Sequence, residues 1–93
     1  MYHYSMEIEY DPQKAKSNLI KHGVTFEEAT TALYDPVALV QEDIDSVNEN
    51  RWVLTGLSNK ANILTVVYTL RGEEIIRLIS ARKATRKEVK YYA

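Results

Sequence analysis

The stretch ANILTVVYTL-RG-EEIIRLISA, residues 61–81, decides the fold of this chain. Its first half, residues 61–70, is rich in apolar and β-branched side chains at both odd and even positions. That pattern is typical of a strand covered on both faces. Arg71-Gly72 predicts a tight hairpin turn, and residues 73–81 predict the returning strand. We therefore expect an antiparallel pair of strands, with residues 61–70 at the centre of a sheet.

Two helices are predicted before this hairpin. Asp11-Pro12 supplies an N-cap and a proline at the first helical position, so a helix begins there and runs to about His22. Gly23 follows it and is typical of a helix C-terminus. Thr25 then begins a second helix, and Glu28 is expected to reach back to the cap as in a capping box.

The remaining segments complete an α+β domain. Strands are expected at residues 6–10, 37–41 and 51–57, with an acidic connection at residues 42–50. Thr85 and Glu88 predict a second capping box, which opens a last helix. The order is β-α-α-β-β-β-β-α, and helices are expected to pack on an antiparallel sheet. We expect one domain over residues 1–93, with residues 1–5 as a loose extension.

Composition excludes several classes of protein. The chain has 93 residues, of which 45% are hydrophobic and 27% charged, as in an ordinary globular domain. No apolar run reaches the ~18 residues of a membrane span, and cysteine is absent. The first residues lack the pattern of a signal peptide. We expect a cytoplasmic protein without disulfides, cysteine metal sites or contact with a membrane.

Charge is distributed unevenly along the chain. The formal net charge is −1, yet residues 35–50 contain five acidic residues and no basic one. Residues 71–93 contain seven basic residues against three acidic ones. This asymmetry indicates either a cationic face for a polyanion or an acidic partner, or a solvated terminal helix of mixed charge.

Candidate residues for chemistry occur at the end of the first helix and in the strands. His22 follows Lys21 in the last helical turn, where the helix dipole favours a protonated imidazole; the alternative is a capping histidine without chemistry. Arg77 stands within an apolar alternation and needs a partner or a bound anion. Arg82 has the opposite parity if the strand stays extended, and Arg51 opens an earlier strand. The alternative for these arginines is a salt bridge to an acidic residue.

The sequence lacks the motifs of most other active sites. His3 and His22 are the only histidines, there is no HExxH motif, and no Gly-rich phosphate loop is present. Imidazole, lysine and arginine suit cleavage of a phosphodiester without a metal ion or other cofactor. In that reaction the ribose 2′-OH attacks the adjacent phosphate, which requires proton transfer and cations around the phosphorane.

Two separated motifs resemble the BrnT toxin family. The first spans residues 10–26 and the second residues 79–85, with Glu88 and Tyr92 following it. In this chain they read Tyr10-Asp11-x-x-Lys14-x-x-x-Asn18-x-x-Lys21-His22-Gly23-Val24-x-Phe26 and Ile79-Ser80-Ala81-Arg82-Lys83-Ala84-Thr85. Arg51, Gly56 and the strand at residues 66–69 are similar in order and spacing. Tyr10 stands where such proteins often have tryptophan.

The resemblance implies a RelE-like fold and a ribonuclease that blocks translation. It also implies a DNA-binding antitoxin, BrnA, which neutralises the toxin in a hetero-oligomer and carries the complex to operator DNA. Carried over by position, the expected active-site residues are Lys21, His22, Arg51, Arg77 and Arg82. His22 is expected to be a general acid or base, with Lys21 as a second candidate, and the arginines are expected to bind phosphate.

Two other functions remain open from the sequence alone. The first is a non-catalytic module that binds RNA, the ribosome or a partner protein through a cationic face. The second is a stable domain whose arginines only pair with acidic residues. An antitoxin is expected to cover the cationic cleft and to add a helix or a strand to exposed apolar surface. Four tyrosines are candidates for that surface: Tyr34, Tyr68, Tyr91 and Tyr92. Core packing is the favoured alternative for Tyr68.

Overall fold

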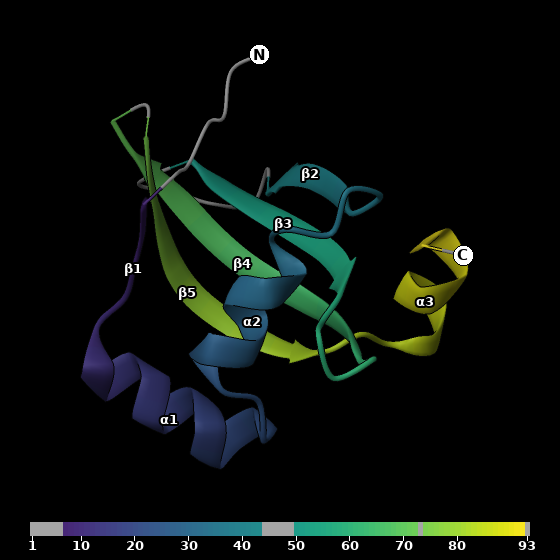
Figure 1. Cartoon of the computed structure of the whole chain (residues 1–93), viewed down its shortest axis with the longest axis horizontal. Helices are drawn as coiled ribbons and strands as arrows, with labels where there is room; N and C mark the ends of the chain where they lie inside the picture. Colours follow the sequence, from purple (N-terminus) through teal and green to yellow (C-terminus); the bar gives the residue numbers. More distant parts are fainter. Residues whose placement is uncertain (1–6, 44–49, 73, 93) are drawn as a thin grey trace.

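One five-stranded sheet organises the computed structural model, with the strand order β1-β5-β4-β3-β2 (Figure 1). The structure describes residues 7–43, 50–72 and 74–92, so the expected loose extension at residues 1–5 and most of the acidic connection lie outside the described residues. In chain order the elements are β1 (Glu7–Glu9), α1 (Pro12–His22), α2 (Phe26–Ala32), β2 (Leu39–Asp43), β3 (Arg51–Leu57), β4 (Ile63–Arg71), β5 (Ile75–Lys83) and α3 (Arg86–Tyr92).

The element order and the central position of β4 confirm the sequence prediction. Strands β2 to β5 pair antiparallel, as expected. Strand β1 differs, because it pairs parallel with β5, with Ile8 opposite Ile76. No hairpin joins these two strands, so turn chemistry does not determine their relative direction. The sheet is therefore mixed, with one short parallel edge.

The boundaries of α1 follow from its two ends. The Asp11 side chain accepts a hydrogen bond from the Gln13 amide at 2.8 Å, and a proline at the start of the helix needs no such partner. Gly23 ends the helix with φ of +70°, a conformation that costs glycine little. Its N–H donates to the Leu19 carbonyl at 2.9 Å. The helix therefore ends at the glycine, where the sequence predicted its C-terminus.

The expected capping box at α2 is only half formed. Thr25 accepts a hydrogen bond from the Glu28 amide at 3.1 Å, but the Glu28 carboxylate does not return to the cap. It accepts instead from Ser58 at 2.7 Å and from Asn62 at 2.9 Å, both in the β3–β4 turn. Burial by itself raises the pKa of this carboxyl, and the hydrogen bonds from Asn62 and Ser58 reverse the effect, so its pKa is lowered. Hydrogen bonds to the β3–β4 turn therefore take the place of the expected local hydrogen bond between the Glu28 carboxylate and the cap.

Helices α1 and α2 cover one face of the sheet, which we call the core face. Phe26 is fully buried there and meets the Tyr10 ring edge to face at 5.1 Å between centroids. Strand β3 approaches α2 so closely that a Cβ at Gly56 would lie 2.8 Å from the Ala32 carbonyl oxygen. The buried core contains these apolar residues: Val24, Phe26, Ala29, Ala32, Leu54, Leu64, Val66, Leu78 and Ala81.

Asn18 joins α1 to the sheet, although the sequence placed it on a polar helix face with Lys14 and Lys21. It is 5% exposed. Its side-chain amide accepts from the Ala81 N–H at 3.0 Å and donates to the Ala81 carbonyl at 2.8 Å. It also donates to the Val24 carbonyl at 2.9 Å. Asn18 thus bonds to the edge of β5 as a neighbouring strand would. Leu19, expected at the buried edge of α1, is 46% exposed.

Candidate active site

A β-bulge in β5 controls which side of the sheet its side chains occupy. Val67 pairs with Ser80 and Tyr68 pairs with Leu78, so Ile79 has no partner in β4. An extra residue of this kind shifts the alternation of all later side chains. Arg77 and Arg82 were expected at opposite parity on an extended strand. The bulge cancels that difference and puts both on the same face of β5.

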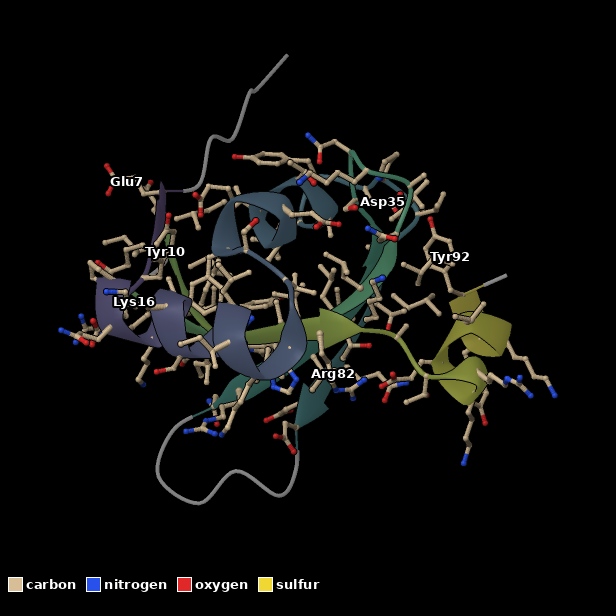
Figure 2. All side chains as sticks on the ribbon, turned by 90° about the horizontal axis from the view of Figure 1, so that it is seen from below. Glu7, Tyr10, Lys16, Asp35, Arg82 and Tyr92 are labelled. Carbon is tan, nitrogen blue, oxygen red and sulfur yellow. The ribbon has the colours of Figure 1, made fainter. Side chains whose placement is uncertain are left out.

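Arg51 lies on this face as well, because the pairing aligns it with Thr69 and aligns Thr69 with Arg77. We call this surface the arginine face; it is opposite the core face and contains Arg51, Thr55, Thr65, Thr69, Arg77 and Arg82. Figure 2 shows Arg82 at the end of β5, on the side of the sheet away from α2. Arg51 of β3 therefore shares one surface with Arg77 and Arg82 of β5.

One row of the arginine face runs from Arg51 through Thr69 to Arg77. The spacing of strands, ~4.8 Å, separates the two arginine Cα atoms by about 10 Å. Thr69 donates a hydrogen bond to the Asn50 carbonyl at 2.8 Å. Arg77 pairs with Glu9 of β1 at 3.3 Å, and its side chain is 32% exposed. The acidic partner considered from the sequence is therefore present for Arg77.

Arg82 lies in a second row of the face, opposite Thr65 and about 13 Å along β4 from the first row. Its Nη1 and Nη2 atoms donate to the two oxygens of Glu88 at 2.7 and 3.0 Å. Nη1 also donates to the Lys83 carbonyl at 3.3 Å. A guanidinium has five N–H donors, so the edge formed by Nε and Nη2 retains two donors without a partner among the described residues.

Glu88 also caps the start of α3. It accepts from the Thr85 amide at 2.8 Å, while Thr85 accepts from the Glu88 amide at 3.2 Å. This reciprocal pair confirms the predicted capping box. The hydrogen bonds from Arg82, with the backbone hydrogen bond from Thr85, lower the pKa of Glu88 to about 2. Glu88 is therefore ionised at neutral pH and holds the guanidinium in a defined orientation.

Lys21 and His22 lie at the end of α1 that follows the Asn18 anchor. Both are exposed in the last turn of α1. Asn18, one turn earlier, is bonded to Ala81 next to Arg82, and a helical rise of ~1.5 Å per residue puts His22 only about 6 Å further along the axis. Within the described residues neither side chain makes a hydrogen bond or ion pair. The structure thus places the three arginines on one face of the sheet, and no hydrogen bond or ion pair joins Lys21 or His22 to them in the described part of the chain.

Sequence reasoning missed the carboxylates that orient the arginines. Glu88 was recognised as a cap, but its six-residue separation from Arg82 gave no sign of a bidentate pair. Glu9 reaches Arg77 only because β1 pairs with β5. Among residues 7–43, 50–72 and 74–92 no cluster of His, Asp and Glu is arranged to hold a metal ion. In the same part of the chain no helix is long and apolar enough to cross a membrane.

Comparison with known proteins agrees with the two sequence motifs. A family model described as the ribonuclease toxin BrnT of type II toxin–antitoxin systems matches residues 10–88. Among solved structures, the chain is similar to the ribonuclease toxin BrnT of Brucella abortus, with a TM-score of 0.67 and 28% identity. That match covers 87% of this chain and 99% of the Brucella chain. No curated protein matches. The matched residues include both motifs up to Glu88.

Proposed function

Since the chain belongs to the BrnT family of ribonuclease toxins of type II toxin–antitoxin systems, we propose that it cleaves RNA without a metal ion and inhibits translation. The observation that supports this most directly is the arginine face, which Arg51, Arg77 and Arg82 share from two strands. An arginine donates two parallel hydrogen bonds to a phosphate, which makes it suited to a phosphodiester. The Nε/Nη2 edge of Arg82, whose two remaining donors have no partner among the described residues, has the geometry for such a contact.

The proposed reaction is attack of the ribose 2′-OH on the adjacent phosphate, with departure of the 5′-oxygen of the next nucleotide. The products are a 2′,3′-cyclic phosphate and a free 5′-hydroxyl. Arg51, Arg77 and Arg82 stabilise the charge that develops on the phosphorane oxygens. His22 transfers a proton to or from the reacting oxygens, and Lys21 is a second candidate for that role. Their exposure at the end of α1 leaves them accessible to a bound strand.

A BrnA-like antitoxin is the partner that we propose, with operator DNA contacted only through the antitoxin. Membership of a toxin–antitoxin family supports an antitoxin in general. Strand β2 is an edge of the sheet, and apolar side chains around it are exposed, including Val37 at 65% and Val40 at 47%. Exposed sheet edges accept added strands. Tyr34 and Tyr91 are also exposed, whereas Tyr68 and Tyr92 are half-buried. We place this hetero-oligomer in the cytoplasm.

A non-catalytic RNA-binding module is the second candidate. The arginine face is compatible with it, because phosphate contacts alone are enough for salt-dependent binding. The ion pairs of Arg77 with Glu9 and of Arg82 with Glu88 favour instead the stable domain whose arginines only pair with acidic residues. The two functions differ in their products. A binder retains intact RNA with a strong dependence on salt, whereas the proposed ribonuclease shortens it.

The test is cleavage of a labelled RNA by the purified chain with and without EDTA, followed by analysis of the new ends. We expect 2′,3′-cyclic phosphate ends in both conditions. His22→Ala and Lys21→Ala are compared with Lys16→Ala, an exposed lysine of the same helix. Figure 2 shows Lys16 at the left of the view and Arg82 near its centre. Loss of a proton-transfer group should reduce the rate by roughly 10²–10⁴-fold, and Lys16→Ala should leave it unchanged.

Three results would count against parts of the proposal. Intact RNA after incubation with the folded chain would reject cleavage. Activity that EDTA removes would reject a metal-independent reaction. Full activity in both His22→Ala and Lys21→Ala would reject the assignment of proton transfer to the end of α1.

A further inference from the structure

A small groove lies beside Arg82 on the arginine face, between the sheet and α3. Its volume is about 190 Å³. We call it the α3 groove; it is lined by Leu39, Gln41, Val53, Thr55, Lys87, Glu88 and Tyr91. Clefts for drug-sized ligands measure ~300–1,000 Å³. The α3 groove therefore suits one planar ring better than a whole nucleotide.

The groove is continuous with the arginine face. Thr55 pairs with Thr65, and Thr65 pairs with Arg82, so one row of the sheet runs from the groove floor to the guanidinium. Glu88 belongs to both, because it lines the groove and holds Arg82 at 2.7 Å. A phosphate bound at the Nε/Nη2 edge of Arg82 would thus leave its attached nucleoside within reach of the groove.

The walls of the groove offer the contacts that an unpaired base needs. Tyr91 is 67% exposed although it is aromatic, and such rings serve as stacking platforms for single-stranded RNA. Gln41 provides an amide donor and an amide acceptor, and Thr55 a hydroxyl, for the edge of a base. Val53 gives an apolar floor. Lys87 adds a positive charge, whereas the charge of Glu88 is balanced by Arg82.

Helix α3 is held in place at both of its ends, so the groove is formed before any ligand binds. At its start, Glu88 is bonded to Arg82 and to the Thr85 amide. At its end, the Tyr92 hydroxyl donates to Asp35, which also accepts from the Leu57 amide at 2.8 Å. Figure 2 shows Tyr92 directed toward Asp35. The hydrogen bond from Tyr92 lowers the pKa of Asp35, so the anionic acceptor is present at neutral pH.

From these contacts we propose that the α3 groove binds one RNA base, stacked on Tyr91, next to the phosphate that Arg82 holds. The proposal rests on the proposed ribonuclease function and adds a subsite to it. A base bound here would anchor the substrate strand along the arginine face. The groove would therefore determine which nucleotide is presented for cleavage.

The test uses an RNA oligonucleotide with 2′-deoxy substitutions, which binds but cannot be cleaved. NMR spectra of the purified full chain are recorded during its titration. We expect chemical-shift changes at the Val53 and Thr55 amides in the groove. Tyr91→Ala should weaken binding by roughly 10-fold and Tyr91→Phe, which keeps the ring, by less than about 2-fold. Tyr34→Ala is the matched control, since Tyr34 is 66% exposed and outside the groove.

The outcomes separate the groove from the reaction. Binding that perturbs Val53 and Thr55 and requires the Tyr91 ring supports the subsite, even if natural RNA is not cleaved. Cleavage of natural RNA with undisturbed groove amides and unchanged affinity in Tyr91→Ala overturns the subsite and leaves the ribonuclease function standing. Perturbation of the groove only by a protein partner, and not by the oligonucleotide, also overturns it.

Discussion

The two faces of the sheet are stabilised by different interactions. On the core face, Leu64, Val66 and Leu78 are at most 1% exposed and pack against α2. On the arginine face, ion pairs and hydrogen bonds orient charged side chains that remain partly exposed, with Arg82 40% exposed beside Glu88. The comparison indicates that the core face carries most of the stability, and the proposed chemistry is assigned to the arginine face. Substitutions on each face should therefore affect different measurements.

The largest effect on stability is expected on the core face. Phe26→Ala removes a fully buried ring together with its edge-to-face contact to Tyr10. Such truncations cost about 3–5 kcal/mol, a large part of the stability of a domain this small. Urea denaturation followed by circular dichroism measures the loss. Ile20→Ala, at an 82% exposed position of α1, should change stability by less than about 0.5 kcal/mol. Equal effects at both positions would contradict the assignment of the core.

A smaller effect is expected at the junction of the two faces. Asn18→Ala leaves the buried Ala81 N–H and the carbonyls of Ala81 and Val24 without their side-chain partner. An unsatisfied buried group costs about 1–3 kcal/mol. Thermal unfolding should show this loss, with Ser17→Ala as an exposed control. A variant that keeps its stability but loses its activity would indicate that Asn18 acts in catalysis rather than in anchoring α1.

Acid should weaken the arginine face selectively. The pKa of Glu88 falls from an ordinary 4.5 to about 2 on folding, so its contribution to stability is complete above pH 4.5 and is lost as the pH falls toward 2. Because Arg82 is partly exposed, we expect roughly 1–2 kcal/mol from this pair. Glu88→Gln should lower stability at neutral pH and reduce the further loss on acidification. If the stability of Glu88→Gln and of the unmodified chain depended on pH in the same way, the assigned contribution of Glu88 would be contradicted.

The smallest effect is expected at the outer edge of the arginine face. Glu9→Gln removes the partner of Arg77 and of Arg71, each at 3.3 Å. Exposed pairs of this kind contribute less than about 1 kcal/mol. The variant should stay folded while Arg77 becomes free to bind phosphate, and RNA affinity measured by filter binding should rise slightly. A drop in RNA affinity would show instead that Glu9 positions Arg77 for binding.

Much of the core face was predictable because its signals are local. The cap at Asp11, the stop at Gly23 and the turn at Gly72, whose φ is +65°, depend on neighbouring residues only. The apolar residues of β4 likewise indicated a central strand, and the described β4 begins at Ile63 rather than at the expected residue 61. The turn between β3 and β4 was expected at residues 58–60, but it also includes Ala61, whose φ is +61°.

The arginine face was less predictable because its signals are long-range. Nothing around Ile79 marks a bulge, yet the bulge decides that Arg77 and Arg82 share a face. Glu28 satisfied the local pattern of a capping box, and its carboxylate nevertheless bonds to Ser58 and Asn62 across the fold. Pairing of β1 with β5 has no local signature either. Contacts of this kind depend on register and on side-chain geometry, which spacing alone does not determine.

The central claim, that Arg51, Arg77 and Arg82 act on RNA from one face, is tested most directly by single-turnover cleavage with each arginine changed to alanine. Arg86→Ala, at an exposed position of α3, is the control. Each of the three variants should lose roughly 10²–10³-fold in rate while circular dichroism shows an intact fold, and the control should match the unmodified chain. Unchanged cleavage in the three folded variants would contradict the account.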